Sequence, residues 1–442
     1  DGIDQGPRAT TADVVVSRIY HAAGFFVPCN RVAYFDASIL RIDPEAEAED
    51  DHGDDVPLEQ HHVDAVLSKA LRTPDGRYRA SASLFIDGRP IGPFTYQGVR
   101  DDDPNDIVPH EDRRELRGSR LLAAWTNHFD AREQNTLAAF VETSKGRGHV
   151  RHYIIDFGDC FGSVWEPPML GRRLGHSYYL DFSYMAEDFL TLGVVTRPWD
   201  VARFGPTGPV LGYYEAELFE PEPWRPGYPN PAFSRMSERD AAWMARIIAR
   251  FSDAHLETLI DTASLADEAL RRVLFEVLRR RRDEILKRYL DRLSPLAHPR
   301  IALFASRADA RGAPPVRWVC LEDLAVSSGI SAANDRLYAA RAFRGAPLEP
   351  AGQRPIRRPK PNEVCVELPR AFSVRATSSA SLDAPERAYV VVDVWAGTRS
   401  HESFPLRVHL YGHGVAADAP ALLDEYSVVG LERPDERNPA TR

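Results

Sequence analysis

The chain has 442 residues, of which 43% are hydrophobic and 27% are charged. This composition is typical of a folded globular protein and excludes a wholly disordered or fibrous chain. Acidic residues outnumber basic ones, 65 to 55, which is the opposite of the balance expected for a general nucleic-acid binder. No apolar run approaches the roughly 18 residues of a membrane-spanning helix, so no transmembrane segment is expected. The length favours two or three domains.

Short helices and strands are expected in the first hundred residues. In chain order they are a helix at 10–24, a strand at 31–35, a helix at 63–71, and a hairpin whose strands, 78–86 and 91–99, pair across the turn Asp87-Gly88. Residues 43–59, DPEAEAEDDHGDDVPLE, contain no lysine or arginine. They predict an exposed acidic insertion near 43–60.

The middle of the chain is expected to contain helices, two short strands and a long irregular region. A helix at 111–125, strands at 138–142 and 150–155, a Pro- and aromatic-rich region to about 235 and a helical run at 237–293 follow in order. Ser237 and Asp240 form a capping-box pattern at the start of that run. Arg279 to Arg282 predict a solvated helix face, because Glu276 and Glu284 lie four residues on either side of Arg280.

After Pro295 the sequence becomes β-like. Strands are expected at 317–321, 389–395, 406–411 and 426–431, and the stretch 350–361 is expected to be a connector. The predicted fold class is α+β, with one domain at 1–295 and a mainly β, sandwich-like domain at 296–442. The four cysteines are widely spaced, and their pattern assigns no disulfide.

One group of residues carries a chemical pattern. The loop after the helix at 111–125 reads His128-Phe129-Asp130 and continues to Asn135, giving H-x-D-x-x-x-x-N. Two strands later comes Asp156-Phe157-Gly158. Phosphoryl transfer needs a carboxylate for the proton of the attacking hydroxyl. It also needs an amide oxygen and a second carboxylate to hold Mg²⁺ against the nucleotide phosphates.

This order and spacing resemble the protein-kinase-like superfamily, most closely its atypical branch of HipA-type and spore-coat CotH-type kinases. The stretch ADVVVSRIYHAAGFFVP at 12–28 is similar to the regulatory helix of that branch and the turn after it. Residues 78–99 would be the strand and hinge region, and 111–125 the helix before the catalytic loop. DAAWMARIIARFSDAHLETLI and LRRRRDEIL are similar to the helical tail of uncharacterised bacterial proteins. The resemblance covers about 10–293.

The resemblance implies a partial small lobe, a helical large lobe, and the cofactors ATP and Mg²⁺. It makes Asp130 the catalytic base and Asn135 and Asp156 the Mg²⁺ ligands. Asp13 would be the helix acid that orients a phosphate-gripping lysine, but no lysine precedes Lys69 in this sequence. The first strands are therefore expected to lie outside this chain, or the protein is a pseudokinase.

Each of these residues also has a structural interpretation. Thr10 and Asp13 fit a T-x-x-D capping box, which we favour for Asp13. Asp130 and Asn135 are common turn residues, and we expect His128 to hold the loop backbone. The only cation upstream, Arg8, is expected to belong to a mobile leader.

Three functions are compatible with the sequence. The first is a kinase-like phosphotransferase that uses Mg-ATP and acts on an unidentified substrate, which could be a protein. The second is an inactive pseudokinase that serves as a binding or structural module, for example at a cell envelope. The third places the function in the C-terminal domain as an adhesion or carbohydrate-binding module. It requires exposed Trp395 and Tyr411, which we expect to be core residues.

Other metal motifs are weaker. Asp101, Asp103 and Asn105 have Ca²⁺-loop spacing, but Asp106 stands where such a loop needs glycine, so a solvated loop is expected. His61-His62 and the pair His149 and His152 lack the ligand pattern of a zinc protease. Compartment and oligomeric state stay open.

Overall fold

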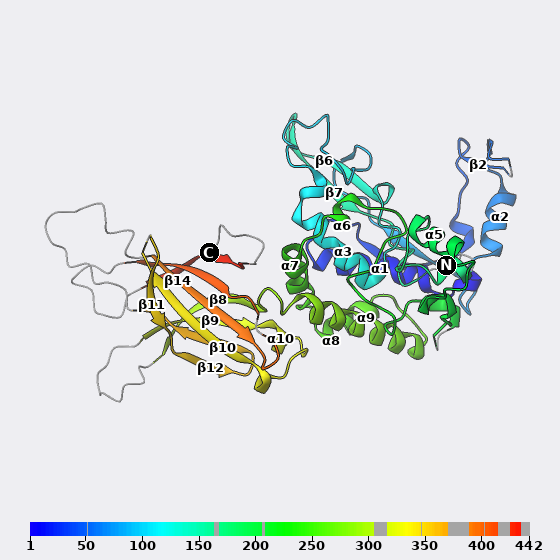
Figure 1. Ribbon diagram of the computed structural model, residues 1–442. Helices are drawn as coiled ribbons and strands as arrows, with labels where there is room; N and C mark the ends of the chain where they lie inside the picture. Colours follow the sequence, from blue (N-terminus) through cyan, green and yellow to red (C-terminus); the bar gives the residue numbers. More distant parts are fainter. Residues whose placement is uncertain are drawn as a thin grey trace. The chain divides into compact units, whose positions relative to one another are not determined.

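The computed structural model describes residues 1–50, 52–162, 168–205, 208–304, 316–345, 347–369, 389–401, 403–413 and 425–434. The chain forms two compact units (Figure 1). Unit 1 comprises Asp1–Asp240 and Phe251–Glu284, and unit 2 comprises Ala241–Arg250 and Ile285–Arg442. Helices and several antiparallel sheets are both present, which confirms the α+β class at this level.

Helices form the core of unit 1. Its longer helices are α1 (Arg8–Ala22), α2 (Gln60–Ser68), α3 (Arg114–Thr126), α5 (Phe182–Leu190), α7 (Glu238–Ile248), α8 (Asp253–Asp261) and α9 (Glu268–Tyr289), of which α7 and α9 continue into unit 2. Trp125, at the end of α3, is fully buried, and its Nε1 donates to the Leu278 carbonyl of α9 at 2.8 Å. This bond joins α3 to α9. The short helices α4 (Pro168–Gly171) and α6 (Pro231–Ser234) lie in the Pro- and aromatic-rich region.

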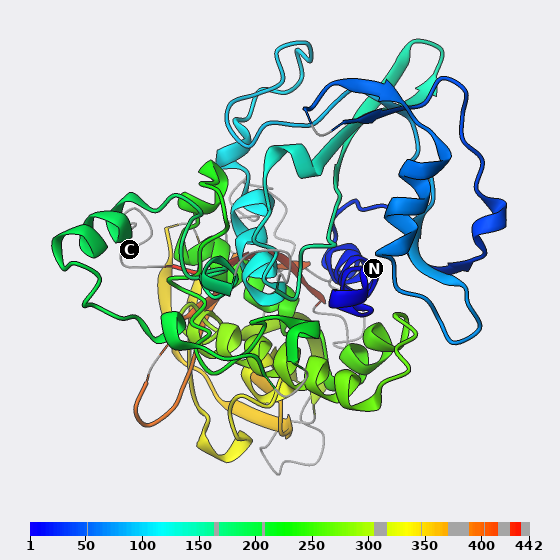
Figure 2. The ribbon, with the colours of Figure 1, turned by 90° about the vertical axis from the view of Figure 1, so that its right-hand side faces the viewer.

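Two small sheets lie on the same side of α1 (Figure 2). Strand β1 (Asn30–Phe35) pairs antiparallel with β4 (Tyr78–Ser83). The second sheet contains β5 (Arg89–Pro90), β6 (Thr136–Ser144) and β7 (Arg147–Ile154). The chain after α1 meets β7, because the Ile154 N–H donates to the Phe26 carbonyl at 3.0 Å.

The predicted hairpin of 78–86 with 91–99 is wrong. Strand β4 pairs with β1, and the chain after Gly88 pairs with β6 instead. Gly88 has a φ of 95°, and a Cβ on it would lie 2.5 Å from the Phe140 carbonyl oxygen. The Asp87-Gly88 pair therefore marks a close crossing over β6, which local sequence cannot distinguish from a hairpin turn.

The acidic stretch at 43–59 forms a small hairpin of β2 (Glu47–Glu49) and β3 (Asp55–Pro57), followed by α2. No described residue of this stretch is buried. Its carboxylates therefore stay in water, where their mutual repulsion costs little.

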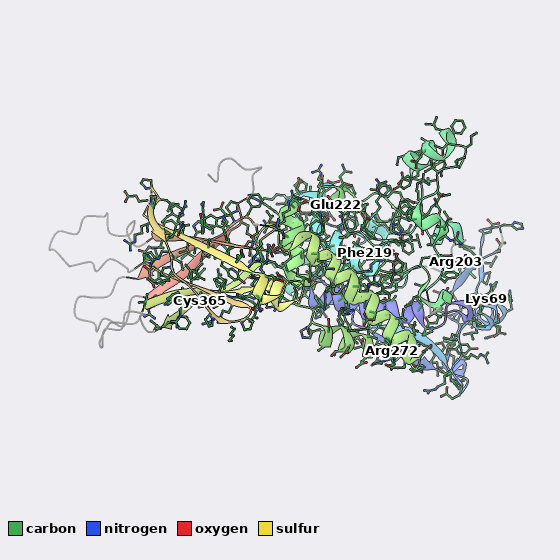
Figure 3. All side chains as sticks on the ribbon, turned by 60° about the horizontal axis from the view of Figure 1, so that its bottom comes forward. Lys69, Arg203, Phe219, Glu222, Arg272 and Cys365 are labelled. Atoms are coloured by element: carbon green, nitrogen blue, oxygen red, sulfur yellow. A yellow bond between two sulfur atoms is a disulfide. The ribbon has the colours of Figure 1, made fainter. Side chains whose placement is uncertain are left out.

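The arginine run 279–282 is only partly a solvated face. Arg279 pairs with Glu276, but Arg281 and Arg282 are buried. Arg281 donates to the Ala124 carbonyl at 2.6 Å and lies 3.8 Å from the ring centre of Phe219, which Figure 3 labels. The spacing placed Glu276 beside Arg280, but Glu276 pairs with Arg279, and Arg280 pairs with Glu217 from outside the helix. Sequence spacing also gave no sign of the carbonyl groups from distant segments. The predicted capping box is present, since the Asp240 N–H donates to Ser237 Oγ at 3.3 Å and the Ser237 N–H donates to the Asp240 carboxylate at 2.9 Å.

Unit 2 contains two antiparallel sheets around one core. The four-stranded sheet has the order β12-β13-β9-β8, and the five-stranded sheet has the order β11-β10-β14-β15-β16. The strands are β8 (Leu296–Phe304), β9 (Val316–Asp323), β10 (Leu337–Arg344), β11 (Glu349–Gln353), β12 (Ile356–Lys360), β13 (Glu363–Glu367), β14 (Tyr389–Gly397), β15 (Leu406–His413) and β16 (Glu425–Glu432). Buried side chains from both sheets, among them Val319, Val364, Val392 and Val408, share one cluster. The sheets therefore pack face to face.

Two predictions for this region are wrong. The stretch 350–361 was expected to be a connector, yet it contributes to strands β11 and β12. Trp395 and Tyr411 are half-buried rather than core residues. In β14 the fully buried side chains of the shared core are at 390, 392, 394 and 396, so Trp395 is on the opposite face.

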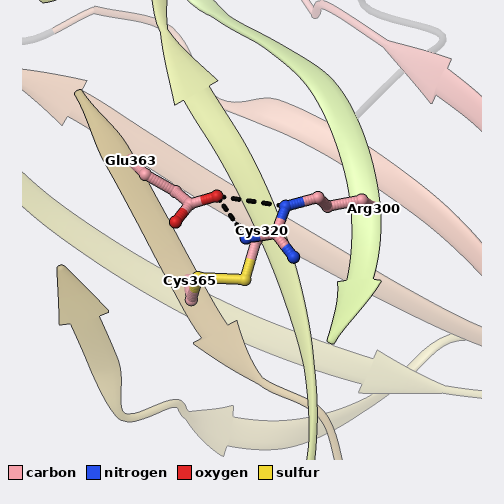
Figure 4. Close-up of a disulfide and its surroundings, with 4 residues drawn as sticks. All are labelled: Arg300, Cys320, Glu363 and Cys365. Atoms are coloured by element: carbon pink, nitrogen blue, oxygen red, sulfur yellow. Dashed lines mark hydrogen bonds and ion pairs between the residues drawn. A yellow bond between two sulfur atoms is a disulfide. The ribbon is translucent and has the colours of Figure 1, made fainter. Parts of the chain in front are cut away.

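A disulfide joins two neighbouring strands of the four-stranded sheet. Cys320 of β9 and Cys365 of β13 are directly opposite in register, with their Cα atoms 3.9 Å apart (Figure 4). Cys29 is exposed and Cys160 is buried, and both are free thiols. Opposing strand positions explain the pairing, which sequence spacing left open.

A buried ion pair supports the turn between β9 and β10. Asp323 and Arg336 have fully buried side chains, and Arg336 Nε lies 2.9 Å from Asp323 Oδ2. Asp323 also accepts the hydroxyl of Tyr338 at 2.8 Å and the Ala325 N–H, which begins α10 (Leu324–Ser327), at 3.0 Å. Asp291 holds the other side of the guanidinium at 3.0 Å.

We predict that Arg336→Met lowers the free energy of unfolding of unit 2 by about 3–5 kcal/mol, because it leaves the Asp323 carboxylate buried without its cation. Arg341→Met is the matched control, since Arg341 is an exposed arginine of β10, the strand that begins directly after Arg336. Its expected effect is within about 0.5 kcal/mol. Scanning calorimetry measures both. Equal effects of the two substitutions would contradict a stabilising role for the buried pair.

Candidate active site

A hydrogen bond closes the loop that follows α3. The helix ends at Thr126. Its C-cap residue, Asn127, has a φ of 52°, and its Oδ1 accepts the indole N–H of Trp224 at 2.9 Å. Eight residues further on, Asn135 Nδ2 donates to the carbonyl oxygen and to the carboxylate Oδ2 of Asp130, both at 2.9 Å. The sequence-predicted pair is therefore in direct contact. Both bonds use Nδ2, so the Oδ1 atom of Asn135 is the one suited to hold a cation.

Asp156 brings a further carboxylate to this loop. It lies two residues beyond the end of β7, its side chain is exposed, and its φ is 59°. A non-glycine residue adopts this left-handed backbone at a cost, and such positions cluster at functional sites. Burial raises the pKa of Asp13 and of Asp130, and the nearby negative charge of Asp156 raises each further.

Asp159 links the two loops. Its Oδ2 accepts the backbone N–H of Asp130 at 3.0 Å, and its side chain is 14% exposed. Burial raises the pKa of Asp159 to about 8, the negative charges of Asp130 and Asp156 act in the same direction, and the Arg8 cation opposes them. Sequence analysis missed this residue, since only its position directly after the Asp-Phe-Gly motif singles it out.

Asp13, from helix α1, also lies close enough to Asp156 to be affected by its charge. It lies in the second turn, where it accepts hydrogen bonds from Asn30 Nδ2 at 2.8 Å, from the Ser81 hydroxyl and from the Phe157 N–H. The predicted capping box is wrong, because Pro7 occupies the N-cap position and no side chain caps it. Asp13 therefore connects α1 to the segment that follows Asp156.

Arg8 is part of the site rather than of a mobile leader. It is the first residue of α1 and only 1% exposed, and its NH1 donates to the carbonyl oxygens of Gly158 at 3.1 Å and Cys160 at 2.9 Å. Burial lowers the pKa of Arg8 to about 10, so the guanidinium is still charged at neutral pH. The prediction failed because it rested on position near the chain start, not on packing.

His128 occupies the interior beneath the loop. It is 1% exposed, and its Nδ1 lies 3.2 Å from the Tyr20 hydroxyl of α1. Burial lowers the pKa of His128 to about 3, so the imidazole is neutral at physiological pH. The ring also contacts Phe157 at 5.3 Å between ring centres. These contacts give His128 a role in packing.

One arginine lies at the carboxylates. Arg132 Nε is 3.0 Å from Asp130 Oδ1, and its side chain is 40% exposed.

The other candidate metal loops have different roles. Asp106, of the loop at 101–106, pairs with His110 and Arg113, and His62 caps α2 by accepting the Glu59 N–H at 3.0 Å.

The raised pKa of Asp159 predicts a pH-dependent stability. An unfolded aspartate titrates at about 3.9, so between about pH 4 and 8 the folded chain keeps a proton that the unfolded chain releases. The free energy of unfolding should therefore fall with rising pH, by at most about 1.4 kcal/mol per pH unit, and level off above pH 8. Asp159→Asn should remove this pH-dependent fall in the free energy of unfolding, because an amide does not titrate, while its oxygen can still accept the Asp130 N–H.

The measurement is the melting temperature from pH 5 to 9 in EDTA, which keeps divalent cations from neutralising the carboxylates. The melting temperature of Asp159→Asn relative to that of the original chain should increase from pH 5 to about pH 8 and then stay constant. Asp101→Asn, at an exposed acid, should follow the original chain throughout. A pH-independent difference for Asp159→Asn would contradict the raised pKa.

Comparisons with protein-family models, with curated proteins and with solved structures found no match to this chain.

Proposed function

We propose that unit 1 is a kinase-like phosphotransferase domain that binds Mg-ATP through Asn135 and Asp156 and uses Asp130 as its catalytic base. The observation that supports this most is the bond of Asn135 to Asp130, together with the position of Asp156 directly after Ile155, whose N–H donates to the Asn135 carbonyl at 3.1 Å. These are a general base, an amide oxygen and a metal-binding acid in one place, as phosphoryl transfer requires. Substrate identity does not enter the proposal.

In this proposal the three residues have distinct roles. Asn135 Oδ1 and the exposed Asp156 carboxylate hold Mg²⁺, whose oxygen ligands lie at about 2.1 Å. Asp130 accepts the proton of the attacking hydroxyl. Its bond from Asn135 Nδ2 fixes the carboxylate, and Asp159 fixes the backbone of the same residue. Bound Mg²⁺ would offset the repulsion among these acids.

The cation that meets the phosphates would be Arg132. It is already paired with Asp130, and its 40% exposure leaves part of the guanidinium accessible to a phosphate oxygen. The two lysines of unit 1, Lys69 and Lys145, are both exposed. Figure 3 shows Lys69 at the periphery of the unit.

An inactive pseudokinase is the second candidate, and one observation favours it. Asp13, the residue implied to orient a phosphate-gripping lysine, accepts hydrogen bonds from Asn30 and Ser81 instead. Buried Arg8 donates to backbone carbonyls. A nucleotide held without an ion pair between Asp13 and a phosphate-binding cation would be positioned less precisely for phosphoryl transfer.

We predict that Mg²⁺ with a non-hydrolysable ATP analogue raises the melting temperature of the full chain. Ligand at ten times its dissociation constant stabilises by about 1.4 kcal/mol. Asp156→Asn should abolish the shift, because the amide cannot replace the charged metal ligand. Asp101→Asn should retain it. An unchanged shift in Asp156→Asn would contradict the assigned metal site.

Catalysis is tested separately from binding. ATP turnover by Asp130→Ala should fall roughly a hundredfold or more relative to the original chain, because the general base is lost. The nucleotide-induced thermal shift should persist in this variant, which shows that the fold and the Mg-ATP site survive. A chain that binds Mg-ATP but shows no turnover above the Asp130→Ala background would support the pseudokinase.

A further inference from the structure

A second group of potential ligands lies beneath the proposed Mg-ATP site. It consists of His128, Asp159 and Cys160, whose ligand atoms all lie within 4.8 Å of one another. His128 Nε2 is 3.8 Å from Asp159 Oδ1, and Cys160 Sγ is 3.9 Å from the same oxygen. His128 comes from the loop before the β6–β7 hairpin, and Asp159 and Cys160 come from the segment after it. None of these three residues is assigned a cofactor role in the proposed phosphotransfer.

The imidazole of His128 supplies the observation that points to a ligand. It is 1% exposed, yet its Nε2 has no hydrogen-bond partner among the residues that the structure describes. A buried polar atom without a partner costs free energy. Tyr20 engages the opposite ring nitrogen, Nδ1, at 3.2 Å. When Nδ1 donates to this hydroxyl, the Nε2 lone pair is directed at Asp159 and Cys160, which is how a metal-binding histidine is oriented.

We propose that His128 Nε2, an Asp159 carboxylate oxygen and Cys160 Sγ bind one Zn²⁺ ion, with water as the fourth ligand. Tetrahedral zinc with nitrogen, oxygen and sulfur ligands places its donor atoms about 3.3–3.6 Å apart. Closing the observed separations of 3.8 and 3.9 Å therefore takes only small side-chain movements. The thiolate and carboxylate together neutralise the charge of Zn²⁺, as a buried site requires.

The donor set distinguishes this ion from the proposed Mg²⁺. Magnesium prefers oxygen ligands, whereas a thiolate and an imidazole select zinc. The zinc site does not depend on the proposed phosphotransfer, because it would act by holding the loop before β6 to the segment after β7. The site also gives a role to Cys160. Cys320 and Cys365 form the disulfide and Cys29 is exposed, so Cys160 is the one buried free thiol among the four cysteines, all of which the structure describes.

The test is a Zn²⁺ titration of the full chain after chelator treatment, against a competing chromophoric chelator and in excess Mg²⁺ without nucleotide. We expect one Zn²⁺ per chain with a dissociation constant below about 1 µM. Cys160→Ser and His128→Gln should each weaken binding at least tenfold. Cys29→Ser, at the exposed free thiol, should bind as the original chain does.

Cobalt provides a readout that does not require the Cys160→Ser chain to fold. In the Cys29→Ser variant the only free thiol is Cys160, so a thiolate-to-Co²⁺ charge-transfer band must come from it. Stoichiometric zinc together with this band supports the site. No stoichiometric zinc in the original chain, no cobalt–thiolate band, or unchanged zinc affinity in folded Cys160→Ser would overturn it. Loss of Mg-ATP binding or turnover alone would bear only on the proposed function.

Discussion

The hydrogen bond from the Asp130 N–H to Asp159 holds the two halves of the candidate active site together. Asp130 lies before the β6–β7 hairpin and Asp159 after it, and their bond is 3.0 Å long. Arg8 extends the connection to α1 through the carbonyls of Gly158 and Cys160, and Asp13 adds a second contact from the same helix to Phe157. A loop, a helix and the segment after a strand are thus fixed by polar contacts around one group of carboxylates.

This arrangement has an electrostatic cost. Burial raises the pKa of Asp13, Asp130 and Asp159, and the charge of Asp156 raises each further. Arg8 and Arg132 supply the positive charge that partly offsets this repulsion. Concentrating partly buried acids in one place lowers the stability of the fold. A divalent cation would remove much of that cost.

Sequence analysis predicted the elements and contacts that local sequence patterns encode. The helices at α1 and α3, the β6–β7 hairpin and the Ser237 cap follow from periodicity and capping chemistry. The Asp130–Asn135 contact follows from loop spacing. Long-range partners were missed, because no local pattern reveals that Arg8 reaches Gly158, that Arg281 reaches Ala124 or that β4 pairs with β1. Asp159 was missed for the same reason.

The most direct measurement is a crystal structure of the full chain with Mg²⁺ and a non-hydrolysable ATP analogue. The account predicts a metal ion ligated by Asn135 Oδ1 and the Asp156 carboxylate at about 2.1 Å, with the terminal phosphate within reach of Asp130 and Arg132. A nucleotide bound elsewhere, or a metal ion that contacts neither Asn135 nor Asp156, would contradict it.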